Sequence, residues 1–420
     1  MPIAAAHAPH PVNEPVKSYE PGSRERAALK SALDDAAKTA VEVPLFIGGK
    51  EIATAQRSPI RSPHDHKLEL GSFSQGDASH VSAAIDAALA ARASWSALSQ
   101  NDRSSVFLKA AELAATTFRY RLNASTMLGQ SKTAYQAEID SACELIDFLR
   151  FNVDWAGRLL EQPVAAPNIW NALEARPLDG FVTAITPFNF IAIVGNLPSA
   201  PALLGNVVVW KPSPLAMRSA YELLSLFRAA GLPDGVINLV QGPAEEMVNA
   251  CLDHPRLGGV HFTGSTAVFR SIWQRVGQNI GRYKAYPRLV GETGGKDFVF
   301  AHQSADLDAL AVALVRGAFE YQGQKCSAAS RAYIPKSIWG ALKERLVAHI
   351  EAIRVGDVRD FRSFMGAVID ERAFLRLSAA IDEAKGGSTY KLVAGGKTDR
   401  ERGWFVHPTV VESTDRKSVV

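Results

Sequence analysis

The sequence predicts an α/β protein of two doubly wound parallel-sheet domains, the second of them incomplete. Short apolar runs alternate with helical patterns between residues 180 and 283, and a second alternating unit lies between 288 and 350. The apolar runs carry few polar residues, as strands that are buried on both faces do. Strands that alternate with helices form parallel sheets covered by helices on both sides. We expect the two domains to span residues 1–290 and 291–420.

The N-terminal part of the chain predicts an arm followed by helices. The stretch up to about residue 40 is polar and rich in proline, and it indicates a loose arm or a helical lead-in. It lacks the charged start and apolar centre of a secretory signal peptide. Further on, apolar residues recur at helical spacing in three stretches. These predicted helices cover residues 80–98, 102–122 and 136–152.

From residue 180 the sequence predicts strands and helices in turn. The stretch 180–210 has no charged residue, but Pro187, Pro198 and Pro201 interrupt it. We therefore expect two buried strands joined by an irregular segment, and not a membrane span. The predicted strands cover 180–186, 206–212, 235–242 and 258–265, and the predicted helices cover 216–233, 244–255 and 266–283.

The composition narrows the class of protein. Its 420 residues are enough for two domains, and 47% of them are hydrophobic, which is ordinary for a globular protein with a sizeable core. The formal net charge of +3 is too small to favour nucleic acid or a membrane surface as a partner. Three cysteines cannot all be paired, and they show no metal-ligand spacing, so we expect a cytoplasmic protein without a bound metal. They are Cys143, Cys251 and Cys326.

One of these cysteines is a candidate nucleophile. Cys326 lies in YQGQKCSAAS (321–330), after Gly323 and before a run of small residues that leave room for a substrate. The neighbouring Lys325, or a helix N-terminus, would favour the reactive thiolate. The alternative for a lone cysteine is a small buried hydrophobic side chain. That alternative fits Cys143 and Cys251, because both lie within apolar helical patterns.

Two further residues are candidates for catalytic roles. Asn189 follows the first predicted strand of the alternating unit, and its amide can donate to a developing oxyanion. Glu292 lies in GETGGK, where the two glycines open space around a carboxylate that can act as a base. The alternatives are a turn asparagine and a glutamate in a surface loop.

A nucleotide site is indicated by different residues, because no strand is followed by GxGxxG. Gly264 and Ser265 end a strand and open a helix, whose free N–H groups could face a phosphate. Lys211 lies at the carboxyl end of a predicted strand, where ligands bind in parallel sheets. The alternatives are an ordinary serine cap and a solvated lysine.

Taken together, these motifs resemble the aldehyde dehydrogenase superfamily. Asn189, Lys211, FTGS, GETGGK and GQKCSA follow one another in the order of that family. Longer stretches are similar to the branch that oxidises L-glutamate γ-semialdehyde, which forms from 1-pyrroline-5-carboxylate in proline catabolism. The resemblance runs from about residue 12 to about residue 413. These stretches include TMLGQSKTAYQAEID, ELIDFLRFN, YPRLVGETGGKDF and EYQGQKCSAASR.

The resemblance implies a mechanism and a set of site residues. The Cys326 thiolate would attack the aldehyde, and Asn189 with the backbone N–H of Cys326 would hold the oxyanion. Hydride would pass to NAD, and Glu292 would activate the water that hydrolyses the thioester. The implied cofactor-binding residues are Thr186, Phe188, Lys211, Ser213, Gly264 and Ser265. The implied substrate-binding residues are Glu144, Phe190, Lys325 and Ser327, although a solvated helix face is an equally good interpretation of Glu144.

The resemblance also implies partners. We expect a small-molecule aldehyde as substrate, and neither nucleic acid nor a membrane as partner. Full-length relatives are homo-oligomers, and a β-arm for oligomerisation is implied near residues 163–179. NAD is the expected cofactor, but Pro214 stands where an acidic residue would repel the 2′-phosphate of NADP, so NADP remains open.

The C-terminal end departs from the family pattern. The EEIFGP motif, the loop that anchors the amino-acid end of the substrate and the last strand have no counterpart here. We expect an early stop or a frameshift, and a second domain that exposes apolar surface and is poorly soluble or partly unfolded after about residue 290. Three hypotheses remain open: an active semialdehyde dehydrogenase, an inactive truncated member that at most binds a nucleotide or a partner, and an aldehyde dehydrogenase for another substrate.

Overall fold

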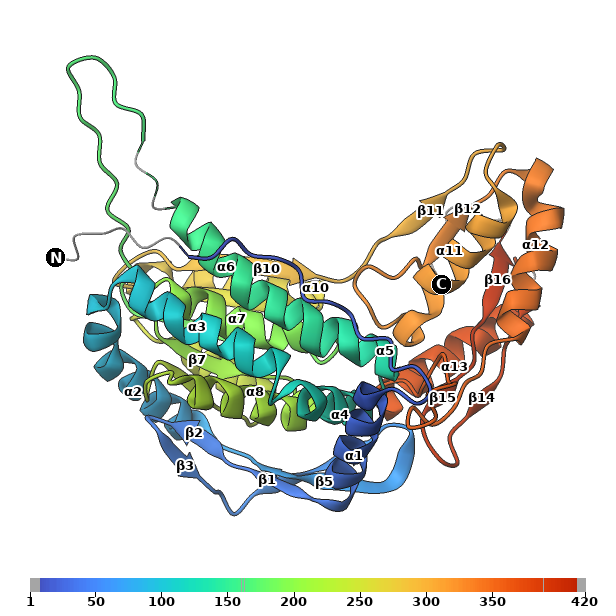
Figure 1. The fold of residues 1–420 in the computed structure, drawn as a ribbon, viewed down its shortest axis with the longest axis horizontal. Helices are drawn as coiled ribbons and strands as arrows, with labels where there is room; N and C mark the ends of the chain where they lie inside the picture. Colours follow the sequence, from blue (N-terminus) through green and yellow to red (C-terminus); the bar gives the residue numbers. More distant parts are fainter. Residues whose placement is uncertain (1–7, 160, 162, 388, 414–420) are drawn as a thin grey trace.

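The computed structural model describes residues 8–159, 161, 163–387 and 389–413. These residues form a large N-terminal part around a seven-stranded sheet and a smaller C-terminal part that lies beside it (Figure 1). Parallel strands and covering helices confirm the predicted α/β class.

The N-terminal part begins with a helix and short strands. The predicted lead-in is α1 (Arg24–Lys38), and Ser23 marks its start by accepting a hydrogen bond from the N–H of Arg26. The short strands that follow were not predicted, because they are only three to ten residues long and mostly half-exposed. They are β1 (Val41–Val43), β2 (Leu45–Ile47), β3 (Lys50–Ile52), β4 (Arg57–Ser62) and β5 (Asp65–Ser74).

The predicted helix 80–98 is confirmed as α2 (Ala78–Ala97), but the single helix predicted over 102–122 is wrong. The chain forms α3 (Gln100–Ala115) and α4 (Arg119–Gln130) instead, with a break at residues 116–118. Two threonines and a phenylalanine occupy this break, and β-branched and aromatic residues are weak helix formers.

The helix predicted over 136–152 contains an irregular turn. It comprises α5 (Ala134–Ala137), the π-helical segment η1 (Glu138–Glu144) and α6 (Leu145–Leu159). A π-helical turn inserts an extra residue and rotates the side chains that follow it. Asp140 and Glu144, both in η1, are turned by it toward the functional site described below.

The large sheet places five parallel strands side by side. Its strand order is β10-β9-β6-β7-β8-β2-β3. Strand β2 runs antiparallel to both of its neighbours, β8 and β3. Because β6 pairs with both β7 and β9, the strand order reverses beside β6, and ligands bind at such a switch point in open α/β sheets. The parallel strands are β6 (Phe181–Ile185), β7 (Val208–Lys211), β8 (Ile237–Leu239), β9 (Leu257–Gly264) and β10 (Arg288–Thr293).

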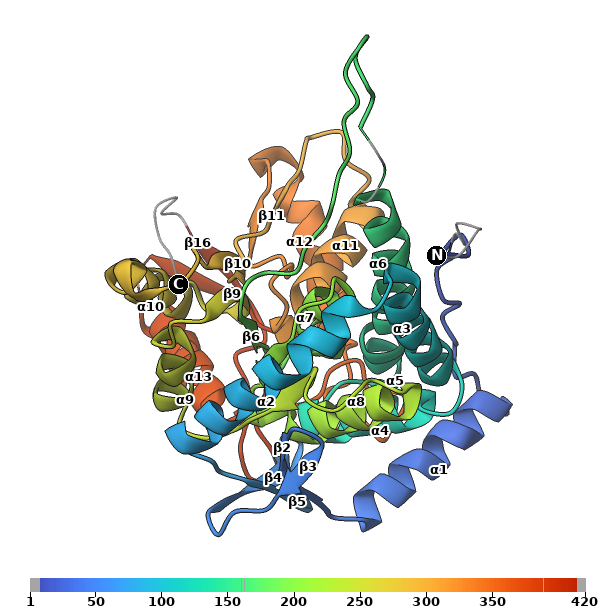
Figure 2. The same ribbon diagram turned by 90° about the vertical axis from the view of Figure 1, so that its left-hand side faces the viewer.

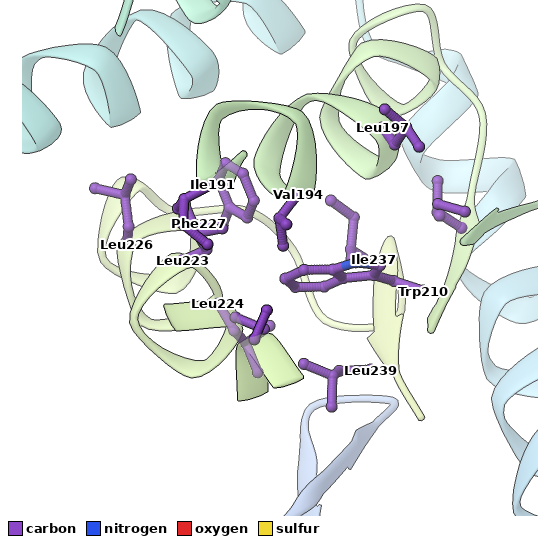
Figure 3. Packing of buried hydrophobic residues seen from close by; sticks show 14 of the residues in the cluster. Ile191, Val194, Leu197, Trp210, Leu223, Leu224, Leu226, Phe227, Ile237 and Leu239 are labelled. Carbon is purple, nitrogen blue, oxygen red and sulfur yellow. The ribbon is translucent and has the colours of Figure 1, made fainter. Parts of the chain in front are cut away.

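Helices cover both faces of this sheet, as predicted. In Figure 2, α9 and α10 lie on one side of the molecule, and α3 and α6 lie on the other. Figure 3 shows α7 and α8 packing against β7 and β8 around Trp210, which is fully buried. Burying one large apolar side chain stabilises the fold by about 1.5–3 kcal/mol. The helices between the strands are α7 (Ile191–Leu203), α8 (Met217–Ala230), α9 (Ala244–Leu252) and α10 (Thr266–Gln278).

The prediction of an irregular segment between the first two strands is wrong, because the chain forms helix α7 there. Pro198 and Pro201 lie in the second half of α7. Each proline removes a backbone donor, but the helix is packed on nearly all sides and its N-terminus is held by the carboxylate of Asp140. Tertiary packing therefore outweighs the local effect of the prolines.

The C-terminal part has smaller sheets and smaller apolar clusters. Its parallel pair is β11 (Phe298–Phe300) with β12 (Arg331–Tyr333), which is covered by α11 (Leu307–Phe319) and α12 (Lys336–Glu351). The remaining elements make two antiparallel pairs and one helix. They are α13 (Glu371–Gly386), β13 (Tyr390–Ala394), β14 (Thr398–Asp399), β15 (Phe405–Val406) and β16 (Val410–Ser413).

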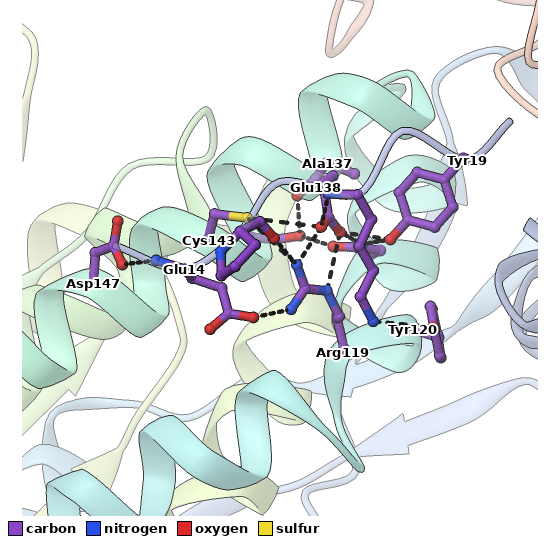
Figure 4. Close-up of polar contacts among 12 residues, drawn as sticks. Glu14, Tyr19, Arg119, Tyr120, Ala137, Glu138, Cys143 and Asp147 are labelled. Atoms are coloured by element: carbon purple, nitrogen blue, oxygen red, sulfur yellow. Dashed lines mark hydrogen bonds and ion pairs between the residues drawn. The ribbon is translucent and has the colours of Figure 1, made fainter. Parts of the chain in front are cut away.

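The segment before α1 is held by a buried polar network. Figure 4 shows Arg119 between Glu14 and Glu138, with Tyr19 donating to Glu138. Cys143 also lies in this network, and burial raises the pKa of its thiol to about 12. Its inert, buried environment fits the structural interpretation of this cysteine.

Most of the segment 163–179 projects away from the body of the protein in both views, while Leu178 near its end is hydrogen-bonded to the body (Figure 1, Figure 2). No strand is formed within these residues, so the implied β-arm has no strands in this structure. Val164 and Trp170 are more than nine-tenths exposed.

In the described parts of the chain, no helix is both long and apolar enough to span a membrane.

Candidate active site

The carboxyl ends of four neighbouring parallel strands bring the predicted site residues to one edge of the large sheet. Register places Ile185 of β6 beside both Lys211 of β7 and Phe262 of β9, and Glu292 of β10 beside Thr263 of β9. Lys211 and Glu292 lie at or near the ends of their strands. Directly after β6 and β9 come Thr186, Phe188, Asn189, Phe190 and Ser265.

The three proposed catalytic residues converge at this edge. The Sγ atom of Cys326 lies 3.4 Å from Oε1 of Glu292, which can accept the thiol hydrogen. Asn189 donates from Nδ2 to the carbonyl oxygen of Gln324 at 2.9 Å, two residues before the cysteine. Its Oδ1 is buried and has no hydrogen-bond partner among the described residues. A thiol, a carboxylate and an amide donor therefore meet, as acyl chemistry on a cysteine requires.

The thiol of Cys326 is held in its protonated form in this conformation. Burial raises its pKa, and so does its hydrogen bond to the Glu292 carboxylate. The expectation that Lys325 or a helix N-terminus favours the thiolate is wrong here. Lys325 is paired with Glu320 at 3.1 Å, and the cysteine lies in an irregular segment between a 3-10 turn and β12. Glu292 is thus the group positioned to take the thiol proton.

The glycine after GETG has a specific steric role. A Cβ atom on Gly295 would lie 2.1 Å from the carbonyl oxygen of Cys326, so a side chain there would displace the backbone of the nucleophile. The predicted open space is therefore filled by the cysteine segment itself. This contact joins the end of β10 to the nucleophile.

The cysteine loop, residues 320–330, is anchored to other parts of the fold. Tyr321 and Gln322 adopt positive φ angles of 49° and 56°, a conformation that costs energy for residues other than glycine. The side chain of Gln322 donates to the carbonyls of Ser131 and Ala367, at 3.1 and 2.7 Å. Gln324 accepts from the N–H of Ile369 at 2.9 Å. These anchors hold the strained loop, and sequence patterns did not identify them.

Among the proposed substrate residues, Glu144 lies in a group of charges that includes Glu292, the hydrogen-bond partner of Cys326. Burial is the main cause that raises the pKa of Glu144 to about 7, and nearby Asp140 and Glu292 add to it while Lys132 and Lys325 oppose it. Glu144 is half-buried and faces this charged group, so the interpretation as a solvated helix face is wrong. The ring of Phe190 lies 4.7 Å from Nζ of Lys132, and Ser327 is exposed beside Cys326.

Residues at the ends of β6, β7 and β9 suit a nucleotide. Lys211 is buried, not solvated, and burial lowers the pKa of its ammonium to about 8. Its one described hydrogen bond, to the carbonyl of Pro212, is long at 3.4 Å, so this cation can still bind hydroxyl oxygens of a ligand. Ser265 caps α10, as predicted, by accepting from the N–H of Val268.

The other predicted cofactor residues also make contacts within the protein itself. Thr186 is buried and accepts from the indole N–H of Trp210, and Ser213 caps a short 3-10 turn. Phe188 packs against the core, and its carbonyl accepts from Gln130. At Gly264 a Cβ atom would meet the ring of Phe262 at 2.7 Å, so packing inside the protein also requires glycine there.

Comparison with known proteins agrees with this arrangement. The family model described as the aldehyde dehydrogenase family matches residues 52–420. The chain belongs to the aldehyde dehydrogenase family. In the described ranges, no three His, Cys, Asp or Glu residues are grouped so that they could hold a metal ion.

Relatives in this family share most of the chain. It is 49% identical over 408 residues to the mitochondrial delta-1-pyrroline-5-carboxylate dehydrogenase of Emericella nidulans. This match covers 96% of this chain and 71% of that relative. The human mitochondrial enzyme of the same name is 44% identical over 405 residues, and this match covers 96% of this chain and 72% of the human enzyme. This aldehyde dehydrogenase chain thus spans about seven-tenths of the length of these relatives.

A solved structure of the family is very similar. The Mycobacterium tuberculosis delta-pyrroline-5-carboxylate dehydrogenase, described as bound with NAD, superposes with a TM-score of 0.96 at 51% identity. The match covers 98% of this chain and 78% of that one. The 1-pyrroline-5-carboxylate dehydrogenase from Thermus gives a TM-score of 0.88 at 29% identity.

Proposed function

We propose that this aldehyde dehydrogenase oxidises L-glutamate γ-semialdehyde, formed from 1-pyrroline-5-carboxylate, to L-glutamate with NAD. The observation that carries the proposal is the convergence of Cys326, Glu292 and Asn189 at one sheet edge, next to charged groups that suit an amino-acid substrate. The relatives described above are named 1-pyrroline-5-carboxylate dehydrogenases, and these names support the choice of substrate.

The first step is addition of the thiol to the aldehyde. Glu292 takes the proton of Cys326, and the sulfur forms a bond to the carbonyl carbon. The carbonyl oxygen becomes an oxyanion, for which the Asn189 amide and the backbone N–H of Cys326 are the two proposed donors. The second Nδ2 hydrogen of Asn189 is available for this, because its described bond to Gln324 uses one.

The hydride of the tetrahedral carbon would pass to a bound NAD, which would supply the oxidant. The residues that would hold it are Thr186, Phe188, Lys211, Ser213, Gly264 and Ser265. The buried ammonium of Lys211 and the free N–H groups of α10 fit its hydroxyls and phosphates. Loss of hydride leaves a thioester on Cys326. The proton that Glu292 took from Cys326 first passes to solvent, to which Glu292 is exposed. The Glu292 carboxylate then takes a proton from water, which attacks the thioester, so that the acid is released and Cys326 leaves as the thiolate.

The charged groups of the site match the two charged groups on the α-carbon of the substrate. Glu144 carries an acid that can pair with the α-ammonium group, and Lys325 and Ser327 are the proposed partners of the α-carboxylate. Phe190 would contact the aliphatic chain between the α-carbon and the aldehyde. Burial makes such charge pairing stronger than it would be in water.

The test is NADH formation from 1-pyrroline-5-carboxylate, compared between the wild-type chain and Cys326→Ala. Turnover that disappears in Cys326→Ala is expected. With Glu292→Gln we expect at most a single equivalent of NADH, because the thioester is not hydrolysed. Soluble wild-type protein that binds NAD but forms no NADH would overturn the proposal and leave the inactive-relative hypothesis.

The cellular location and the assembly state remain predictions. Free cysteines support the cytoplasm, whereas several relatives are named as mitochondrial. The exposed apolar side chains of residues 163–179 support a contact between copies of the chain.

A further inference from the structure

A lysine that the proposed mechanism does not use lies directly behind the site. Lys132 follows α4, and its side chain is completely buried. It forms an ion pair with Asp140, whose side chain is 3% exposed. Replacing a buried ion pair by apolar residues is often neutral or stabilising, so the pair itself is weak evidence for stability. Its position points to another role.

Lys132 lies between the two segments that carry the catalytic groups. Its Nζ atom is 4.7 Å from the centre of the Phe190 ring and 4.4 Å from the centre of the Tyr321 ring. Phe190 is next to Asn189, and Tyr321 is in the strained turn of the cysteine loop. A cation attracts the faces of both rings, so one ammonium group holds both segments.

Asp140 extends this arrangement to the start of α7. Its two carboxylate oxygens accept from the N–H groups of Ile191 and Ala192, at 3.2 and 3.4 Å. These are the first residues of the helix that follows Asn189 and Phe190. An anion at a helix N-terminus is favourable, and here it fixes the turn that presents the Asn189 amide.

We propose that Lys132, through Asp140, Phe190 and Tyr321, is a positioning residue that aligns the Asn189 amide with the Cys326 sulfur. The inference rests on the proposed function for the identity of the reaction. It does not depend on which aldehyde is the substrate, because Lys132 lies behind the catalytic groups and not among the proposed contacts to the substrate carboxylate.

The main test is the neutral pair Lys132→Met/Asp140→Asn, which leaves no unpaired buried charge. We expect its melting temperature and its affinity for NAD to stay near those of the wild type. We expect kcat to fall by about 100-fold, the size of effect produced by a misplacement of about 1 Å. The loss should be equal for 1-pyrroline-5-carboxylate and for propionaldehyde, which carries no charge. Wild-type kcat in this variant, or a loss confined to the charged substrate, would overturn the inference.

A matched control removes another buried ion pair. Arg119→Met/Glu138→Gln takes the same charges from the network around the N-terminal segment. It is expected to lower the melting temperature, because Arg119 and Glu138 also bind the backbone of that segment at Pro15 and Lys17, and to leave kcat unchanged. If the Lys132 double variant is insoluble or does not bind NAD, Lys132 is required for folding and the positioning role is rejected.

A second readout separates this inference from the proposed function. Cys326 is the one cysteine of the three that is not buried, so its alkylation by iodoacetamide can be followed without any turnover. Loss of the Lys132 cation releases Tyr321, and the alkylation rate should rise several-fold in the double variant. An unchanged rate contradicts the inference. Wild-type protein that is inactive on both aldehydes contradicts the proposed function, and the alkylation result still decides the role of Lys132.

Discussion

At the scale of single residues, the chemistry of this aldehyde dehydrogenase depends on how burial changes ordinary side chains. Lys211 and Glu144 are the residue types that the proposed site requires. Desolvation raises the pKa of Glu144 to about 7 and lowers the pKa of Lys211 to about 8. Burial and the Glu292 carboxylate raise the pKa of Cys326, which disfavours its thiolate form. A general base is therefore needed beside it, and Glu292 is the carboxylate within reach.

Glu144 gives a pH-dependent prediction. Its folded pKa of about 7 means that the carboxylate is mostly neutral at pH 6 and mostly ionised at pH 8. The ionised form attracts the α-ammonium group of the substrate, so KM should fall as pH rises, by about tenfold between these values. The measurement is the ratio of KM for the wild type to KM for Glu144→Gln at each pH, because other titrations cancel in it. A ratio that is constant or rises with pH would contradict the prediction.

The elements around the site make close contacts with one another at particular points. The loop after β10 contacts the cysteine loop through the backbone of Gly295, and Gln322 and Gln324 link the cysteine loop to more distant segments. Substitutions outside the catalytic groups should therefore change activity.

Gly295→Ala tests this contact. A methyl group there has to displace the backbone of Cys326, and we expect kcat to fall by about 100-fold. Gly294→Ala is the matched control, because its Cβ atom would meet only Oγ1 of Thr266, at 3.9 Å, and neither glycine has a positive φ. NADH formation by both variants is compared after their melting temperatures have been shown to be similar. Equal activity of the two would refute the steric role.

His64 connects the β4–β5 hairpin to the C-terminal part. It is buried, 3.2 Å from the hydroxyls of Ser62 and Ser131 and 3.5 Å from Asp357. Burial lowers its pKa from 6.5 to about 4, although Asp357 and Asp65 oppose the shift and Arg359 and Arg402 add to it. The neutral form therefore belongs to the folded state.

The stability contribution of His64 has a defined sign. A lowered folded pKa gives stability that is present above pH 6.5 and is lost as pH falls toward 4, because the unfolded chain binds the proton more readily. The loss amounts to about 3 kcal/mol for the full shift. The midpoint of urea unfolding should thus fall more steeply on acidification in the wild type than in His64→Asn. Parallel curves would show that His64 does not contribute.

At the scale of the whole molecule, the two parts differ in how much apolar surface they bury. One large cluster, from Tyr19 to Val276 with the addition of Val358, holds the N-terminal part together. The C-terminal part has two small clusters, and Phe298 and Phe300 of β11 are 60% and 77% exposed. Exposed aromatic residues on a short two-stranded sheet favour association or local opening.

Hydrogen exchange should report this difference. We expect amides of β6, β7 and β9 to exchange only on global unfolding, and amides of β11 and β12 to exchange through local opening. The expectation of partial unfolding after about residue 290 is tested in the same experiment. Equal protection of both parts, with one cooperative melt of soluble protein, would contradict it.

The sequence by itself determined the α/β class and the alternation of strands and helices from residue 180, and it proposed Cys326, Glu292, Asn189 and Lys211 as site residues. Each of these rests on local information: hydrophobic period, glycine and proline positions, and a motif order typical of the family. Strand ends that bear reactive side chains must meet when the strands are parallel neighbours, so the site could be predicted from that pattern.

Only the tertiary structure decided the remainder. It formed α7 despite two prolines, divided the helix predicted over 102–122 and inserted the π-helical turn that directs Asp140 and Glu144 toward the site. It also placed Lys132 between Phe190 and Tyr321. These features depend on contacts between residues far apart in the chain. Burial sets their energies and their pKa values, and a local pattern carries no information about burial by distant segments.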